Sequence, residues 1–146
     1  MRKFQLRFLL SFIILVAISK TTTAQVVISQ VYGGGGNSGA TYTNDFIEIF
    51  NRGTISISLN GWSVQYAAAT GTSWQKTDLT NVTLAPGQYY LIQESAGAAG
   101  TTPLPTPDAT GTIAMSGTAG KVALLNTNVL IVSGTSCPSC VTLVDL

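Results

Sequence analysis

Asp45 and Glu48 are the most closely spaced acidic residues of the chain and the first candidates for chemistry. Paired carboxylates can share general acid–base work or hold a divalent cation. These two lie three residues apart in the β-rich run 45–51, and side chains at that spacing in a strand point to opposite faces. We therefore expect Asp45 to bind loop amides, and Glu48 to bind a backbone group or Arg52. The alternative is a calcium or ligand contact that draws on the glycine run just before them.

The chain contains no histidine. Its absence excludes Ser-His-Asp and Cys-His catalysis, histidine general bases and histidine-ligated zinc. A secreted nuclease normally needs a histidine or a cluster of acids around a metal ion, and the six acidic residues of this chain are scattered. We therefore predict that the protein has no catalytic residue, metal site or cofactor, and that it is not an enzyme.

Cys137 and Cys140 form a Cys-x-x-Cys sequence. In an exported chain, a disulfide is the expected fate of such thiols. A redox role would need a helix to activate one thiol, but the pair falls in a loop before an expected strand. A zinc site would need two more cysteine or histidine ligands. A local bridge closes a very tight loop, so a bridge from one cysteine to a partner beyond residue 146 is the alternative.

Aromatic residues could line a sugar-binding face, although in strands they more often belong to a core. The candidates are Trp62, Tyr66, Trp74, Tyr89 and Tyr90. We expect Trp62 and Tyr90 in the core. Trp74 falls in a polar connection, and it is the aromatic residue that we expect to contact a ligand.

Two segments of unusual composition predict loops. The glycine run, Gly33–Gly36, lacks the Gly-Lys-Ser/Thr ending and the helix of a phosphate-binding loop, so we expect a flexible loop. The segment 95–111 holds three prolines and almost no large apolar residue. A stretch of this length without its own structure predicts a mobile surface loop or a binding loop.

Residues 1–24 predict a secretory signal peptide, with a basic start, an apolar run and small residues before a cleavage site after Ala24. The apolar run has about a dozen residues, short of the roughly 20 that span a bilayer. Residues 25–146 then form one domain. They keep three of the seven cationic residues and all six acidic ones, so their net charge is −3, which argues against general nucleic-acid affinity. We expect a secreted, extracellular or cell-surface protein.

The pattern after residue 24 predicts strands and no helix. Apolar residues alternate at 55, 57 and 59, and again at 62, 64 and 66 after an Asn60–Gly61 turn, which predicts two strands with one buried face each. Further strands are expected over 26–32, 45–51, 80–84, 88–94, 112–115, 121–125, 129–132 and 141–146. Pro86–Gly87 predicts a turn, and 121–125 with 129–132 a hairpin. Together, these strands and turns predict an all-β sandwich.

The chain ends on the strand pattern 141–146, with no turn or tail after it. An exposed apolar strand edge invites aggregation. We therefore expect the sandwich to be the N-terminal part of a longer chain.

Four segments in order resemble the bacterial secreted branch of the lamin tail domain family. They are 27–37 (VISQVYGGGGN), 45–53 (DFIEIFNRG), 59–64 (LNGWSV) and 84–92 (LAPGQYYLI). The order and spacing of the four segments carry the resemblance, which extends over nearly all of residues 26–146. Similar family members continue past this point with a Val-Gly-Tyr-Gly-like run, so we expect the last strand to be truncated.

The resemblance implies an immunoglobulin-like antiparallel β-sandwich and an accessory or interaction module with no known catalytic residues. Such modules are attached to secreted nucleases, phosphoesterases or proteases, or belong to cell-surface proteins. Three roles are therefore expected. The chain is a non-catalytic module, or the N-terminal module of an extracellular hydrolase with its catalytic domain downstream, or an adhesion or carbohydrate-binding domain that uses Trp74 and the segment 95–111.

Overall fold

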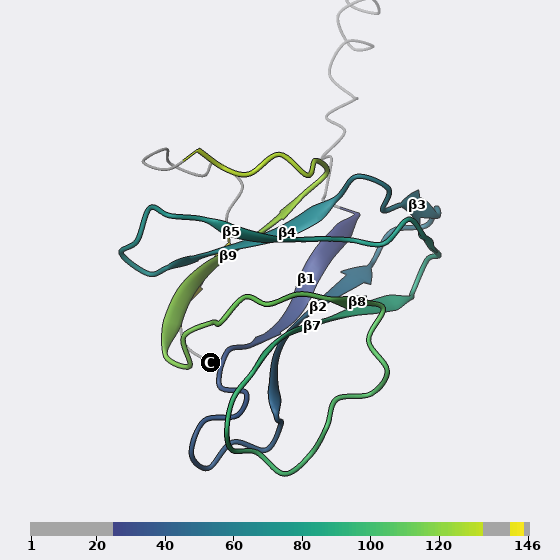
Figure 1. Ribbon diagram of the computed structural model, residues 1–146. Helices are drawn as coiled ribbons and strands as arrows, with labels where there is room; N and C mark the ends of the chain where they lie inside the picture. The colour runs from purple at the N-terminus through teal and green to yellow at the C-terminus, as the bar shows by residue number, and fades with distance from the viewer. Residues whose placement is uncertain (1–24, 133–140, 145–146) are drawn as a thin grey trace, which may run out of the picture.

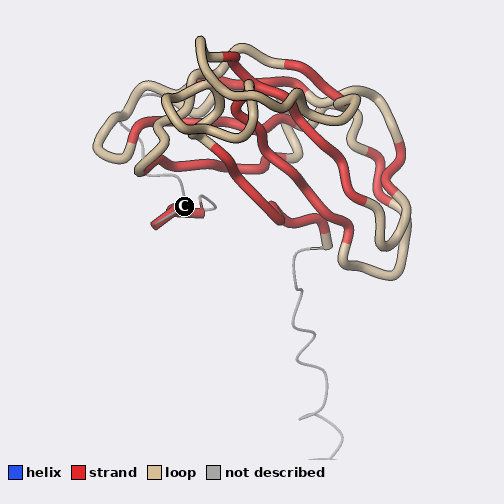
Figure 2. The backbone as a smooth tube through the Cα atoms, turned by 90° about the horizontal axis from the view of Figure 1, so that it is seen from below, coloured by secondary structure: helices blue, strands red, loops and turns tan. Residues whose placement is uncertain are grey.

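The computed structural model describes residues 25–132 and 141–144. Within these ranges it contains ten strands and no helix (Figure 1). The strands are β1 (Val26–Tyr32), β2 (Asn44–Asn51), β3 (Ile57–Ser58), β4 (Ser63–Ala68), β5 (Gln75–Asp78), β6 (Thr83–Leu84), β7 (Tyr89–Ala96), β8 (Ala109–Thr110), β9 (Ala119–Leu125) and β10 (Val141–Val144). Seen from below, the strands make up the body of the protein and the loops its margins (Figure 2).

The strands form two four-stranded sheets and a two-stranded ribbon. The first sheet has the order β1-β2-β7-β8, the second has the order β10-β9-β4-β5, and β3 pairs with β6 in the ribbon. Every pair is antiparallel except the short parallel pair β7–β8. In Figure 1 the second sheet lies above the first. The predicted all-β, immunoglobulin-like architecture is confirmed.

The core lies between the two sheets, because the inward side chains of both are apolar. Ile47 and Ile49 of β2 and Ile92 of β7 are fully buried, as are Val64 of β4 and Val122 of β9. In β2 and β7 the inward residues alternate with less buried outward ones, as the two-residue period of a strand requires. Each such side chain contributes about 1.5–3 kcal/mol when it leaves water.

Both predicted turns are confirmed. Asn60–Gly61 joins the ribbon to β4, with Trp62 N donating to the Leu59 carbonyl at 3.0 Å. Gly61 and Gly87 have φ of 75° and 76°, a backbone conformation that glycine adopts without the steric cost of a Cβ atom.

The strand predicted over residues 55–59 is wrong in its first half. Only Ile57–Ser58 pairs as a strand, and Ile55 is 61% exposed. The reason is a side chain: Asn51 Nδ2 donates to the Ile55 carbonyl at 2.9 Å and to the Leu84 carbonyl at 2.8 Å. The side-chain amide of Asn51 therefore donates to the Ile55 carbonyl, which in a strand would accept a backbone amide of the neighbouring strand.

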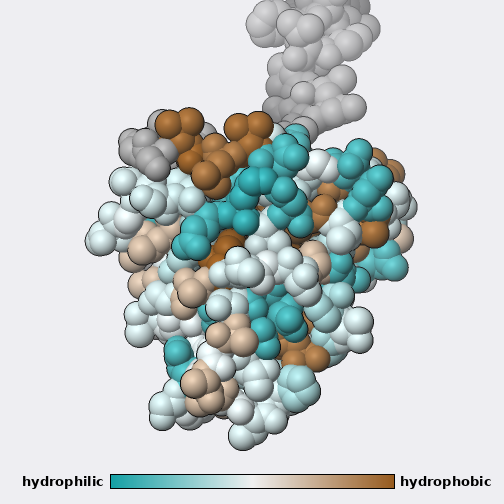
Figure 3. Space-filling model, viewed as in Figure 1, coloured by the Kyte–Doolittle hydropathy of each residue, from teal (hydrophilic) through white to brown (hydrophobic). Residues whose placement is uncertain are grey.

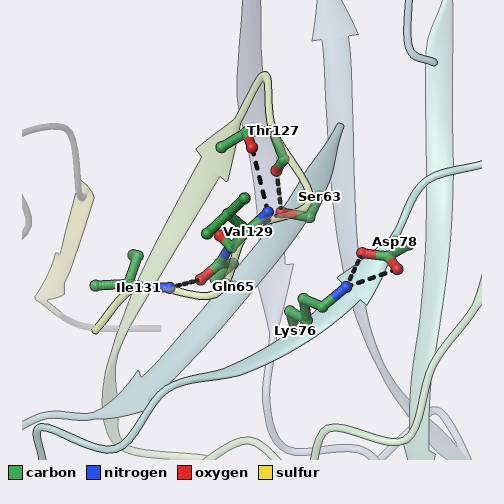
Figure 4. A network of polar contacts seen from close by, with 7 residues as sticks. All are labelled: Ser63, Gln65, Lys76, Asp78, Thr127, Val129 and Ile131. Atoms are coloured by element: carbon green, nitrogen blue, oxygen red, sulfur yellow. Dashed lines mark hydrogen bonds and ion pairs between the residues drawn. The ribbon is translucent and has the colours of Figure 1, made fainter. Parts of the chain in front are cut away.

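β4 is buried on both faces, although the alternation of apolar residues along it predicts only one buried face. Ser63 and Gln65, which point away from the core, are 0% exposed. Residues 127–131, here called the strap, lie over them. Ser63 Oγ donates to the Thr127 carbonyl at 2.7 Å, and Gln65 Nε2 donates to the Val129 carbonyl at 2.8 Å. Figure 4 shows both side chains directed at the strap.

The strap also replaces the predicted hairpin. β9 forms as expected, but residues 129–132 form no strand. Ile131 N donates to Gln65 Oε1 at 2.9 Å, so the returning chain bonds to a side chain of β4 in place of the backbone of β9. The exposed Lys76–Asp78 pair in the same view is a surface salt bridge, a type that contributes little.

Gln65→Ala is expected to destabilise the protein by about 3 kcal/mol, because it leaves the Val129 carbonyl and the Ile131 amide without their partner. Chemical denaturation of the two proteins measures the difference. Gln75→Ala is the matched control, since Gln75 is exposed on the neighbouring strand β5. Equal midpoints for the two variants would show that the strap is not held by Gln65.

Residues 112–115 do not form the predicted strand. They belong to the segment 111–116, the first part of the connection from β8 to β9, which runs between the two sheets in Figure 1. We call residues 111–116 the closing segment. Gly111 N still donates to the Gln93 carbonyl of β7 at 2.7 Å, but the amides of Ile113 and Met115 bond to carboxyl side chains.

The glycine run and the segment 95–111 pack against each other, where the sequence predicts two independent loops. Ala99 N donates to the Gly36 carbonyl at 2.8 Å. A Cβ atom on Gly36 would lie 2.2 Å from the Gly97 Cα atom, so only glycine permits this approach. The two segments form the lower end of the molecule in Figure 1.

Candidate functional site

Asp45 lies at the start of β2, where the register with β7 shifts between Asn44 and Phe46. The shift turns the Asp45 carboxyl group inward, and the residue is 4% exposed. Oδ1 accepts a hydrogen bond from Gly35 N at 2.8 Å, and Oδ2 accepts one from Met115 N at 2.8 Å. One carboxylate thus joins the glycine run to the closing segment, which confirms the predicted bond to loop amides.

Glu94 lies on the neighbouring strand β7 and is 1% exposed. Its Oε2 accepts a hydrogen bond from Ile113 N at 3.0 Å. Its Oε1 and the Thr77 Oγ1 of the opposite sheet are buried, and within the described residues neither has a hydrogen-bond partner. A Cβ atom on Gly111 would lie 2.0 Å from Thr77 Oγ1 and 2.2 Å from Glu94 Oε2. The hydroxyl and the carboxyl group therefore flank the same glycine without the alignment of a hydrogen bond.

Burial raises the pKa of both carboxyl groups above the ordinary value. For Asp45, the loss of water outweighs the bonds from Met115 N and Gly35 N, which favour the charged form. For Glu94, desolvation is again the largest cause of the raised pKa, opposed by the Thr77 hydroxyl and the Ile113 amide. The negative charge of Asp45 raises the pKa of Glu94 further.

The chemistry open to this pair is limited by the contacts that it already makes. Three of the four carboxyl oxygens accept backbone amides, and the fourth, Glu94 Oε1, is enclosed. Over residues 25–132 and 141–144, no group of three or more acidic or cysteine side chains could hold a metal ion. The two carboxyl groups therefore bind backbone amides, and the chemistry left to them is the gain and loss of a proton.

A family model, the Lamin Tail Domain, matches residues 19–136. The chain belongs to the lamin tail domain family. A comparison with curated proteins gave no match. In the described part of this lamin tail domain, no helix is long and apolar enough to cross a membrane.

Glu48 is not brought together with Asp45 in this lamin tail domain. It lies on the outer face of β2, and its Oε1 accepts a hydrogen bond from Ser29 Oγ at 2.6 Å. Ser29 sits at the irregularity in the β1–β2 register, between Ile28 and Gln30. The partner of Glu48 is thus a side chain of β1, where the sequence predicts a backbone group or Arg52.

Trp74 is 7% exposed, in contrast to the surface position expected of a ligand contact. It packs against Ala67 and Ala123 on the outer side of the second sheet, and Lys121 Nζ lies 5.6 Å from the centre of its ring. This small outer cluster explains why a tryptophan in a polar stretch is buried. Among the residues that the structure describes, Tyr89 is the exposed aromatic residue, at 59%, and its ring centre lies 4.5 Å from that of Phe50.

Trp62 and Tyr90 lie in or against the core, as predicted. Cys137, Cys140, the predicted signal peptide and the end of the predicted last strand lie outside the described residues.

Glu94 is the site residue that the sequence interpretation missed. The signal was present, because Glu94 continues the inward series of Tyr90 and Ile92 at a spacing of two residues. A buried position for an acidic residue could therefore have been read from the alternation.

Glu94→Gln is expected to stabilise the protein at about pH 7 by about 1 kcal/mol, because the amide avoids a buried charge and can donate to Thr77 Oγ1. The pKa of Glu94 is raised above its ordinary value of 4.5, so the folded state binds this proton more tightly than the unfolded chain. The resulting stability is complete below the ordinary value and is lost as the pH rises through the folded pKa.

Thermal unfolding of the parent protein and of Glu94→Gln, from about pH 4 to about pH 7, measures the effect. The advantage of the variant should vanish at about pH 4, where Glu94 is protonated in both states. An advantage that is constant with pH would contradict the assignment.

Proposed function

We propose that this lamin tail domain is a secreted, non-catalytic accessory or interaction module of the bacterial secreted branch of the family. The observation that carries the proposal is the use of its two buried acids. Asp45 and Glu94 are the groups best suited to acid–base or metal chemistry, and their oxygens hold the amides of Gly35, Ile113 and Met115. Carboxyl groups bonded in this way stabilise the fold.

The strap supports a role in contact with a partner. Val129 and Leu130 of the strap are 69% and 43% exposed, and Val132, which follows it, is 69% exposed. Apolar residues of the strap show as the brown groups at the upper left of Figure 3. Neighbouring exposed apolar side chains on a backbone that is bonded to a buried strand are common in protein contact surfaces.

An activity screen of the exported protein tests the proposal. The substrates are single- and double-stranded DNA, a phosphodiester dye and casein, each with and without added magnesium and calcium. We expect rates equal to the buffer blank. Glu94→Gln is the informative variant, because it is expected to remain folded. Turnover that is present in the parent protein and lost in Glu94→Gln would overturn the proposal.

A further inference from the structure

The two sheets differ in what lies on their outer faces. On the second sheet, the strap and the cluster around Trp74 cover the outward side chains, and Ser63 and Gln65 are 0% exposed. On the first sheet, the outward side chains of β1, β2 and β7 are half-buried or exposed, apart from that of Phe46. The first sheet therefore presents to solvent a face that the second sheet lacks.

The strand register sorts the side chains of this face into three rows across the sheet. Opposite residues of antiparallel strands lie side by side, and alternate residues of one strand share a face. In the order β1, β2 and β7, the first row is Val27, Phe50 and Tyr89, the second is Gln30, Glu48 and Leu91, and the third is Tyr32, Phe46 and Gln93. Two rows with aromatic rings therefore flank a middle row that is polar over β1 and β2.

Each flanking row contains two aromatic rings in contact. The ring centres of Phe50 and Tyr89 lie 4.5 Å apart, and those of Tyr32 and Phe46 lie 5.4 Å apart with the ring planes 17° from parallel. Phe46 and Phe50 are four residues apart along β2, so the two ring pairs lie about 13 Å apart. Tyr42 meets Tyr32 and Phe46 edge-on and closes the third row. Rings packed in this way offer contact area with little side-chain freedom left to lose on binding.

The polar side chains between the ring pairs offer both acceptors and donors. Ser29 Oγ donates to Glu48 Oε1 at 2.6 Å, which fixes the carboxylate and leaves its Oε2 to accept from a ligand. Gln30 is exposed and Gln93 is half-buried, and each side-chain amide can donate as well as accept. A ligand on this face would therefore meet hydrogen-bonding groups between two aromatic surfaces.

The polarity and charge of the three rows select the class of ligand. A protein contact surface has an apolar centre and a polar rim, whereas here polar side chains lie between aromatic ones. A nucleic acid needs cationic side chains against its phosphates, but the charged side chain within the three rows is the negative Glu48. A neutral sugar chain fits both features, because ring faces contact its C–H surfaces and the polar side chains bind its hydroxyl groups.

We propose that the outer face of the first sheet binds a neutral polysaccharide, with Tyr89 and Tyr32 against sugar rings at its two ends and the middle row on the hydroxyl groups between them. This site shares no residue with the one that the sequence predicts around Trp74 and the segment 95–111. The inference rests on the proposed role as an interaction module, and it names the chemical class of the partner.

Affinity electrophoresis of the protein in native gels that contain arabinoxylan, β-glucan, galactomannan or pullulan tests the proposal. Chitin and cellulose powders are tested by co-sedimentation, and gels with heparin or single-stranded DNA give the comparison with charged polymers. We expect binding to at least one of the neutral polysaccharides. Tyr89→Ala should raise the apparent dissociation constant roughly tenfold, and Tyr89→Phe, which keeps the ring, should change it by less than about twofold.

Val129→Ala is the matched control, because it shortens an exposed apolar side chain on the outer side of the other sheet. It should bind as the parent does, and the circular dichroism spectra of all variants should match that of the parent. The proposal is overturned by no binding to any neutral polysaccharide, by binding to heparin or DNA alone, by equal binding of the parent and Tyr89→Ala, or by an equal loss in Val129→Ala. Any of these results would leave the non-catalytic role standing, since the activity screen tests that role separately.

Discussion

Replacing Gly35 by alanine is expected to destabilise the protein by about 3 kcal/mol, at the upper end of the usual cost of overpacking. A Cβ atom at this position would lie 1.9 Å from the Asn44 carbonyl carbon and 2.1 Å from Asp45 N. Both are backbone atoms of β2, so no side-chain rotation relieves the clash. The shift would also pull Gly35 N away from Asp45 Oδ1, which it meets at 2.8 Å. In thermal unfolding we expect a midpoint about 10 °C lower.

Gly34→Ala is the matched control for this substitution. The nearest atoms to a Cβ atom on Gly34 belong to the Tyr32 ring, at 3.7 and 3.8 Å, an ordinary contact distance. Its backbone φ is not among the positive values found in the chain. We therefore expect a change within about 1 kcal/mol. Equal loss at both positions would mean that the glycine run is not packed against β2.

Asp45→Asn is expected to cost about 2 kcal/mol at neutral pH. The substitution keeps the shape and removes a buried charge, but it turns one acceptor into a donor. Either Gly35 N or Met115 N then faces an amide NH₂ group in place of the oxygen that it meets at 2.8 Å. The loss of a hydrogen bond at a buried backbone amide outweighs the gain from removing the charge. Urea denaturation of the two proteins gives the difference.

Glu48→Gln is the control on the same strand. Glu48 binds Ser29 Oγ through Oε1 on the outer face, and a glutamine can keep that bond, so little change is expected. Asp45→Asn and Glu94→Gln are both isosteric losses of a buried charge, yet we expect opposite signs. If both variants were stabilised at neutral pH, charge burial alone would govern the site and the amide bonds of Asp45 would contribute little.

The sequence by itself determined those strands that a short run of residues is enough to predict. β1, β2, β7 and β9 follow from runs of alternating or β-branched residues, and the turns at Gly61 and Gly87 follow from residues that accept positive φ. The bond of Asp45 to loop amides was also predictable. An acid at the entry of a strand beside a glycine-rich loop has backbone donors close by in sequence.

Only the tertiary structure decided which polar groups are buried and what they hold. Asp45 meets Met115 across 70 residues, and Gln65 meets Ile131 across 66. Residues 112–115 and 129–132 have strand-like sequences, but the amides of Ile113, Met115 and Ile131 bond to side chains of β7, β2 and β4. Local pattern gives a residue's preferred backbone shape. It does not specify the distant acceptor that satisfies a buried amide, because burial makes any correctly placed oxygen as effective as a strand partner.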